Sequence, residues 1–101
     1  MQVGLGRVTL YLPMNHSLKG KRQVLRSVTQ RLRNRFNLAV AEVGHRDGWQ
    51  TAVLGLAGVG EDPVHLRRTL EQAVEFIRQE VLGEGEVLDW EVEVFPAGDE
   101  D

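Results

Sequence analysis

The order of apolar and polar positions along the chain predicts six elements. Alternating or short apolar runs predict strands over residues 3–12, 38–43, 49–59 and 86–95. Apolar residues that recur every three or four positions predict helices over residues 15–36 and 62–81. The expected order is therefore strand, helix, strand, strand, helix, strand.

Local signals support these boundaries. We expect Ser17 to cap the first helix, and Asp62 followed by Pro63 has the residue types that open a second one. The segment from His45 to Gly48 is typical of a tight hairpin loop. Gly4 and Gly6 in the first strand indicate a bulge or a close backbone approach.

Two strand–helix–strand units joined at a hairpin predict a fold of the α+β class. Right-handed crossovers lead to a ferredoxin-like βαββαβ sandwich, with a four-stranded antiparallel sheet and two helices on one face. Residues 1–95 are expected to form this single domain, and residues 96–101 an acidic C-terminal tail. In the last strand, the inward residues are expected to be Leu88, Trp90, Val92 and Val94, with Trp90 in the core.

Composition narrows the class of protein. The 101 residues contain no cysteine, which excludes disulfides and thiolate metal sites. No metal site is expected, because the three histidines lack partners at ligand spacing. No apolar run approaches the roughly 20 residues of a membrane span. A cytoplasmic protein without membrane contact is therefore the expectation.

Charge is divided unequally along the chain. Residues 1–41 carry eight Lys and Arg and no acid, whereas residues 42–101 carry four basic and fifteen acidic residues. Such asymmetry suggests a polyanionic partner. We therefore predict RNA binding by phosphate contacts along the first helix, through Lys19, Lys21, Arg22, Arg26 and Arg33. The alternative is internal neutralisation, with Glu71 and Glu75 of the second helix as partners.

The sheet is a poor candidate for RNA. RNA-binding sheets of this topology stack bases on aromatic residues of the central strands, and here the first strand offers Tyr11 alone. The second and third strands are apolar or small on both faces, which favours a covered outer face and hence a homodimer. Its expected interface residues are Arg7, Thr9 and Tyr11. The alternative is that small side chains expose little apolar area.

Enzymatic chemistry finds little support. Acylphosphatases share this topology, but the loop at residues 13–17 lacks the arginine that their phosphate cradle needs. No catalytic residue and no cofactor is predicted. Glu42 is interpreted as a buried partner for an arginine such as Arg7. A homodimeric interaction domain or a small-molecule regulatory domain, with residues 58–62 as its glycine-containing turn, stays open as an alternative to RNA binding.

Two segments also carry a resemblance. H-S-L-K-G-K-R at residues 16–22 and R-N-R-F-N-L-A-V-A-E-V at residues 33–43, followed by D-G-W-Q, resemble the YlxP-like family of small bacterial proteins. The resemblance covers nearly the whole chain and implies a ferredoxin-like fold without an assigned activity. Genes of that family tend to lie among those for translation initiation and ribosome maturation. This neighbourhood implies ribosomal RNA or a ribosomal subunit as the partner.

Overall fold

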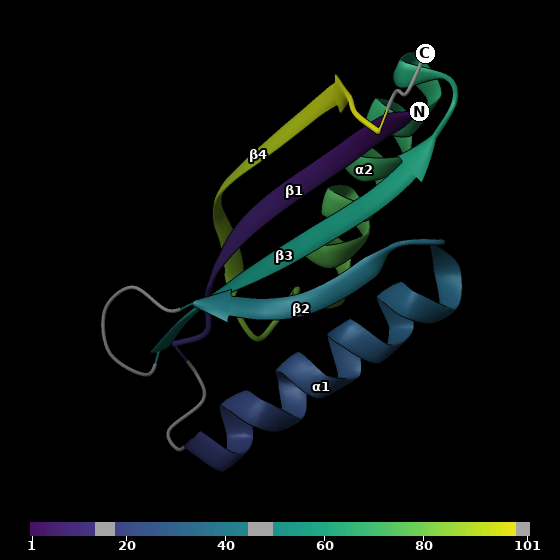
Figure 1. Cartoon of the computed structure of the whole chain (residues 1–101). Coiled ribbons are helices and arrows are strands. Elements are labelled where there is room, and N and C mark those ends of the chain that lie inside the picture. Colours follow the sequence, from purple (N-terminus) through teal and green to yellow (C-terminus); the bar gives the residue numbers. More distant parts are fainter. Residues whose placement is uncertain (14–17, 45–49, 99–101) are drawn as a thin grey trace.

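The computed structural model of the chain describes residues 1–13, 18–44 and 50–98. Its elements follow the predicted order (Figure 1). They are β1 (Gln2–Tyr11), α1 (Leu18–Arg35), β2 (Ala39–Gly44), β3 (Thr51–Gly60), α2 (Pro63–Glu80) and β4 (Glu86–Pro96). Ser17, the segment from His45 to Gly48 and Trp49 lie outside the described residues, so the predictions made for them stay predictions.

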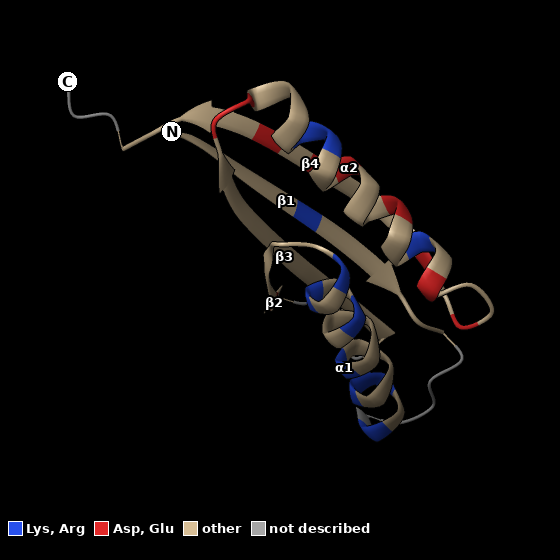
Figure 2. Ribbon diagram, turned by 90° about the vertical axis from the view of Figure 1, so that its right-hand side faces the viewer, with Lys and Arg blue, Asp and Glu red and all other residues tan. Residues whose placement is uncertain are grey.

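The four strands form one antiparallel sheet in the order β2-β3-β1-β4. The strands β1 and β3 are central, and β2 and β4 are the edges. Both helices cover the same face, with α2 over β1 and β4 and α1 beside β2 (Figures 1 and 2). The predicted ferredoxin-like sandwich is confirmed.

The core lies between the sheet and the two helices. Val8, Leu10 and Leu12 are fully buried, as their alternation in β1 predicts. The helices contribute Leu32 from α1 and Leu70 from α2, which are also fully buried. Burial of these apolar side chains supplies most of the free energy that holds the helices to the sheet.

The start of α2 agrees with the capping signal in the sequence. The Asp62 carboxylate accepts hydrogen bonds from the backbone amides of Val64 at 2.9 Å and His65 at 3.4 Å. Pro63 occupies the first turn, where its missing amide hydrogen costs no helical hydrogen bond.

The C-terminal end of α1 meets α2 through aromatic side chains. The rings of Phe36 and Phe76 lie 5.7 Å apart at an interplanar angle of 74°, an edge-to-face arrangement. The Arg35 guanidinium lies 5.3 Å from the centre of the Phe76 ring. One cation of α1 is thus used in packing.

Two predictions for β4 are wrong, the inward position of Leu88 and the place of Trp90 in the core. The pairing of β1 with β4 shifts register between Thr9 and Leu10, so that Leu88 is an extra residue in β4. Leu88 is therefore 51% exposed, and Val87 takes the inward place at 9%. Trp90 lies opposite Val8 but on the edge strand, where 41% of it is exposed, so it is not a core residue.

The close approach predicted at the first-strand glycines and the predicted C-terminal tail have different outcomes. Gly4 provides a close approach, because a Cβ atom there would lie 2.6 Å from Leu70 Cδ1. The predicted tail begins later than expected, since β4 includes Pro96 and the Ala97 amide donates a 2.9 Å hydrogen bond to the Met1 carbonyl. Neither helix, over its described residues, is long and apolar enough to cross a membrane.

Candidate nucleic-acid interface

The helix α1 presents a row of cations on the outside of the molecule. In Figure 2 the ribbon of α1 is coloured for Lys and Arg at positions along its length, and α1 contains no Asp or Glu. Lys19, Arg22 and Arg26 are exposed. This surface is separate from the sheet face, because α1 covers the opposite side of the sheet.

Three arginines of α1 line a depression beside the edge strand β2. Its volume is about 220 Å³. The lining residues are Arg22, Leu25, Arg26, Thr29, Gln30, Arg33 and Glu42. Positions 22, 26, 29 and 33 follow one another at three- and four-residue steps, which places them along one side of a helix. Thr29 and Gln30 were missed in the sequence reading, although the same spacing would have selected them.

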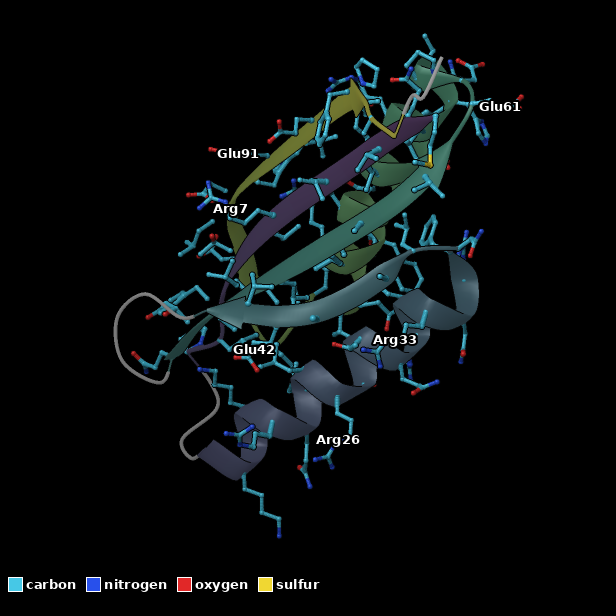
Figure 3. The ribbon with its side chains drawn as sticks, in the orientation of Figure 1. Arg7, Arg26, Arg33, Glu42, Glu61 and Glu91 are labelled. Atoms are coloured by element: carbon cyan, nitrogen blue, oxygen red, sulfur yellow. The ribbon has the colours of Figure 1, made fainter. Side chains whose placement is uncertain are left out.

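Arg33 connects α1 to the sheet. Its Nη2 atom donates a 2.6 Å hydrogen bond to the carbonyl oxygen of Val40 in β2. Figure 3 shows Arg33 and Arg26 on the same helix, with Glu42 on the neighbouring strand. The guanidinium of Arg33 is therefore held in place, whereas Arg22 and Arg26 make no side-chain hydrogen bond or ion pair to any described residue.

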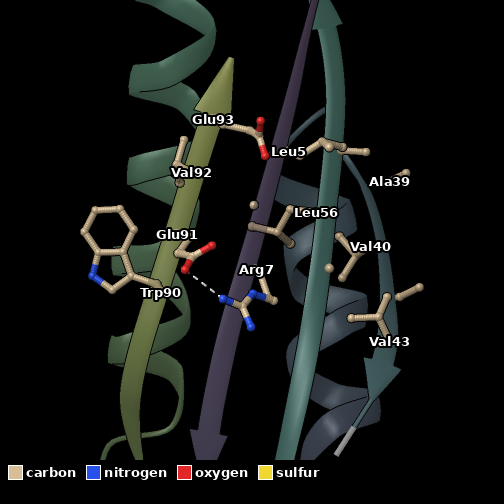
Figure 4. Close-up of a pocket in the computed structure, with 14 residues that line it drawn as sticks. Leu5, Arg7, Ala39, Val40, Val43, Leu56, Trp90, Glu91, Val92 and Glu93 are labelled. Atoms are coloured by element: carbon tan, nitrogen blue, oxygen red, sulfur yellow. Dashed lines mark ion pairs between the residues drawn. The ribbon is translucent and has the colours of Figure 1, made fainter. Parts of the chain in front are cut away.

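Glu42 does not have the role expected for it. It is exposed and lines the depression, whereas the sequence reading made it a buried partner of Arg7. Arg7 instead pairs with Glu91, with Nη2 and Oε2 2.8 Å apart (Figures 3 and 4). The strand order explains the difference, because β3 separates β2 from β1 while β4 is the direct neighbour of β1.

Lys21, one of the residues predicted to contact phosphate, is buried in this structure. Only 7% of it is exposed, because it lies four and seven residues before Leu25 and Val28 on the buried side of α1. Lys19, two positions earlier, is exposed. The accessible cations of the depression are thus Arg22 and Arg26, with Arg33 partly engaged by the backbone, and Lys19 is exposed one turn before Arg22.

The carboxylates of α2 neutralise little of the positive charge of α1. Arg31 Nη1 lies 2.8 Å from Glu80 Oε1, and this is the sole ion pair between the two helices among the described residues. Glu75 is used within α2, where it accepts from Gln79 at 3.0 Å and pairs with Arg78 at 3.3 Å. The Gln79 hydrogen bond, and next to it Arg78, hold the pKa of Glu75 below its usual value. Glu71 forms no ion pair with α1 in the described part of the chain.

The open face of the sheet is a second, chemically different surface. A groove of about 780 Å³ runs over it (Figure 4). Its lining is apolar or small on β2 and β3, whereas β4 contributes Glu91 and Glu93. Aromatic side chains for base stacking are lacking among the described residues of the central strands apart from Tyr11, which is partly buried.

The three expected dimer residues alternate with the inward-facing Val8 and Leu10 in β1, and one of them is buried. The Arg7 side chain is 44% exposed, and Tyr11 lies near the end of β1. Thr9 is fully buried within the single chain, so it has no surface left to bury against a partner.

Over residues 1–13, 18–44 and 50–98, no three His, Asp or Glu side chains are grouped as metal ligands.

The comparisons with known proteins concern family and fold. The family model described as "Protein of unknown function (DUF503)" matches residues 3–92. The protein named "Uncharacterized protein YlxP" from Bacillus subtilis (strain 168) is 38% identical over 61 residues. That match spans 60% of this chain and 66% of the relative, just under two thirds of its length.

Two solved structures share the fold at low identity. One, named "Putative Chlorite dismutase", superimposes with a TM-score of 0.58 at 8% identity, over 95% of this chain and 45% of that one. The other, a variant of SnoaB, a cofactor-independent oxygenase from Streptomyces nogalater, gives 0.52 at 13% identity, over 98% and 95%. Both are ferredoxin-like, and at these identities they show the fold alone. By its sequence, the chain belongs to the DUF503 family of proteins of unknown function.

Proposed function

We propose that this protein is a cytoplasmic, non-enzymatic domain that binds the phosphate backbone of ribosomal RNA through α1. The observation that carries the proposal is the exposed pair Arg22 and Arg26, whose side chains have no partner among the described residues. They are one helical turn apart, a spacing that costs a few tenths of a kcal/mol for like charges. Retaining them fits a role in binding an anion better than a role in stability.

The chemistry of the depression suits phosphate. Guanidinium groups donate two parallel hydrogen bonds to a phosphate, which a lysine cannot do. Thr29 and Gln30 add a hydroxyl and an amide beside the arginines. Contacts of this kind position a protein on a nucleic-acid backbone and do not read sequence. We therefore expect recognition of RNA shape and charge, with little dependence on base identity.

The location on α1 is supported by the charge of the other surfaces. The outer sheet face carries Glu91 and Glu93, which repel phosphate. The exposed surface of α2 mixes both signs, as in the pair of Glu75 and Arg78. Of the described helices and strands, α1 combines the most cations with no acid of its own.

The test is binding to bulk ribosomal RNA and to ribosomal subunits over a salt series. For each phosphate neutralised, the slope of log K against log salt changes by about 0.7–0.9. The double variant Arg22→Gln/Arg26→Gln should therefore reduce the slope by about 1.4–1.8. The control Arg67→Gln/Arg68→Gln removes the same charge from α2 and should change the slope much less. Equal effects of the two variants, or no binding of the wild-type protein at low salt, would overturn the proposal.

A further inference from the structure

The outer face of the sheet is unusually apolar for a surface in water. Leu5, Val43 and Val59 are 41%, 60% and 64% exposed, because they lie on the face that no helix covers. We propose that a second copy of this chain covers this face, related to the first by a two-fold axis that runs parallel to the strands between β1 and β3. The proposal is independent of RNA binding by α1, which lies on the other side of the sheet.

Two neighbouring rows of this face carry small residues on β2 and β3 and larger ones on β1 and β4. Residues that are paired in an antiparallel sheet project from the same face, so the register defines rows across it. From β2 to β4, one row reads Ala39, Ala57, Leu5 and Glu93, and the next reads Ala41, Gly55, Arg7 and Glu91. In these two rows the larger side chains lie on β1 and β4, while the Val43 side chain of β2 covers Gly55. Figure 4 shows Leu5, Arg7, Val43, Glu91 and Glu93 around the groove.

This division is self-complementary under the proposed axis. Rotation about an axis between β3 and β1 reverses the order of the strands but keeps each row in place. Leu5 of one copy then packs on Ala57 of the other, and Arg7 lies beside Val43, whose side chain fills the space above Gly55. In the row of Leu5 and Ala57, a large side chain thus meets a small one on both sides of the axis, which gives the self-complementarity that an isologous interface requires.

The positions of the charged side chains favour this axis over an axis perpendicular to the strands. An in-plane axis perpendicular to the strands would place β4 against β4 and bring Glu91 and Glu93 close to their own symmetry mates. The proposed axis places these carboxylates over Ala39 and Ala41 instead. Arg7 enters the interface already paired with Glu91 at 2.8 Å, so the ion pair carries no net charge into it.

The available area is compatible with a specific but modest dimer. The central strands have ten residues each. At about 3.3 Å per residue and 4.8 Å per strand, a four-stranded face covers roughly 600 Å². Two such faces bury about 1,200 Å², the lower limit of the usual range for specific interfaces. The equilibrium therefore has to be measured over a wide range of protein concentration.

The experiment is sedimentation velocity of the whole chain from micromolar to near-millimolar concentration. We expect the wild-type protein to reach twice its 11.4 kDa mass. Ala41 is exposed on the edge strand and faces Glu91 of the other copy in the proposed dimer. Ala41→Glu should raise the dimer dissociation constant at least tenfold by like-charge repulsion, whereas Ala41→Arg should not raise it. The control Gln72→Glu, on the exposed side of α2, should leave the constant unchanged within twofold.

Each result has a defined meaning. A monomeric wild-type protein at all concentrations overturns the proposal and leaves the groove to another occupant. Equal weakening by Ala41→Glu and Ala41→Arg, or weakening by neither, rejects the proposed axis. Circular dichroism checks that the variants are folded. If Ala41→Glu does not fold, Ala39→Glu provides the same test one row away, against Glu93.

Discussion

Arg33 donates a hydrogen bond of 2.6 Å from its Nη2 atom to the carbonyl oxygen of Val40. This bond joins the last turn of α1 to the edge strand β2. Arg22 and Arg26 line the same depression without such an attachment in the described part of the chain. The three arginines are alike in sequence, but they divide into one structural residue and two that are available to a ligand.

The first prediction concerns stability. Arg33→Gln should lower the free energy of unfolding by about 1–2 kcal/mol, because it removes a partly buried hydrogen bond from a charged donor. Arg22→Gln should change it by less than about 0.5 kcal/mol, as is usual for an exposed residue. Urea denaturation of the two variants tests the difference. Equal midpoints would show that the Arg33 hydrogen bond adds nothing in solution.

The second prediction concerns the acid in the depression. Glu42 opposes phosphate binding next to Arg22 and Arg26, so Glu42→Gln should increase the affinity for ribosomal RNA. The gain should be at most about 1 kcal/mol, roughly fivefold, for one charge about 4 Å away in water. Glu71→Gln removes the same charge from α2 and should have a smaller effect. A decrease in affinity on Glu42→Gln would argue that the depression does not hold phosphate.

The third prediction concerns the contact between the two helices. A double-mutant cycle of Arg31→Gln and Glu80→Gln should give a coupling energy of about 0.2–1 kcal/mol, because the Arg31 side chain is largely exposed. The coupling should fall as salt is added. Thermal unfolding of the four proteins at two salt concentrations measures it. A coupling that is large and independent of salt would instead support neutralisation of α1 by α2.

The fourth prediction concerns the turn after α2. A Cβ atom at Gly85 would collide with the carbonyl oxygen of Tyr11 and lie 2.8 Å from Leu12 Cδ2. Gly85→Ala should therefore destabilise the protein by about 1–3 kcal/mol. Gly60→Ala is the matched control, because a Cβ atom there meets nothing within 4 Å. Thermal unfolding tests this, because Gly85→Ala should have a lower melting temperature than Gly60→Ala. The reverse order would contradict the packing described for this turn.

Much of the fold was predictable from local chemistry. Asp62 and Pro63 indicated the start of α2, and the amide hydrogen bonds to Asp62 confirm it. The alternation of Val8, Leu10 and Leu12 indicated the buried face of β1. These predictions succeed because caps and burial patterns depend on neighbours within one element. The prediction for Leu88 failed because a bulge there changes the alternation, and a bulge depends on the partner strand. Trp90 keeps its place opposite Val8 but lies on an edge strand, which leaves it 41% exposed.

Residue spacing along the chain predicted only part of the candidate site. Helical periodicity identified the basic side of α1, but Lys21 is buried and Arg33 is bonded to Val40. Glu42 and Arg7 looked like partners, yet the strand order places Glu91 next to Arg7. Side chains at fixed steps along one element follow from the backbone period. Contacts between elements depend on how the sheet is ordered.

The amino-acid sequence alone determined the element order, the fold class and the concentration of positive charge on one helix, because these are properties of residues close together in the chain. The tertiary structure decided which cations remain free, since burial of Lys21 and the bond from Arg33 to Val40 require α1 to be packed beside β2. It also decided that Leu5 and Arg7 stand beside Ala57 and Gly55 on one open face. Such neighbours, about 50 residues apart in the chain, meet only when long-range strand pairing forms.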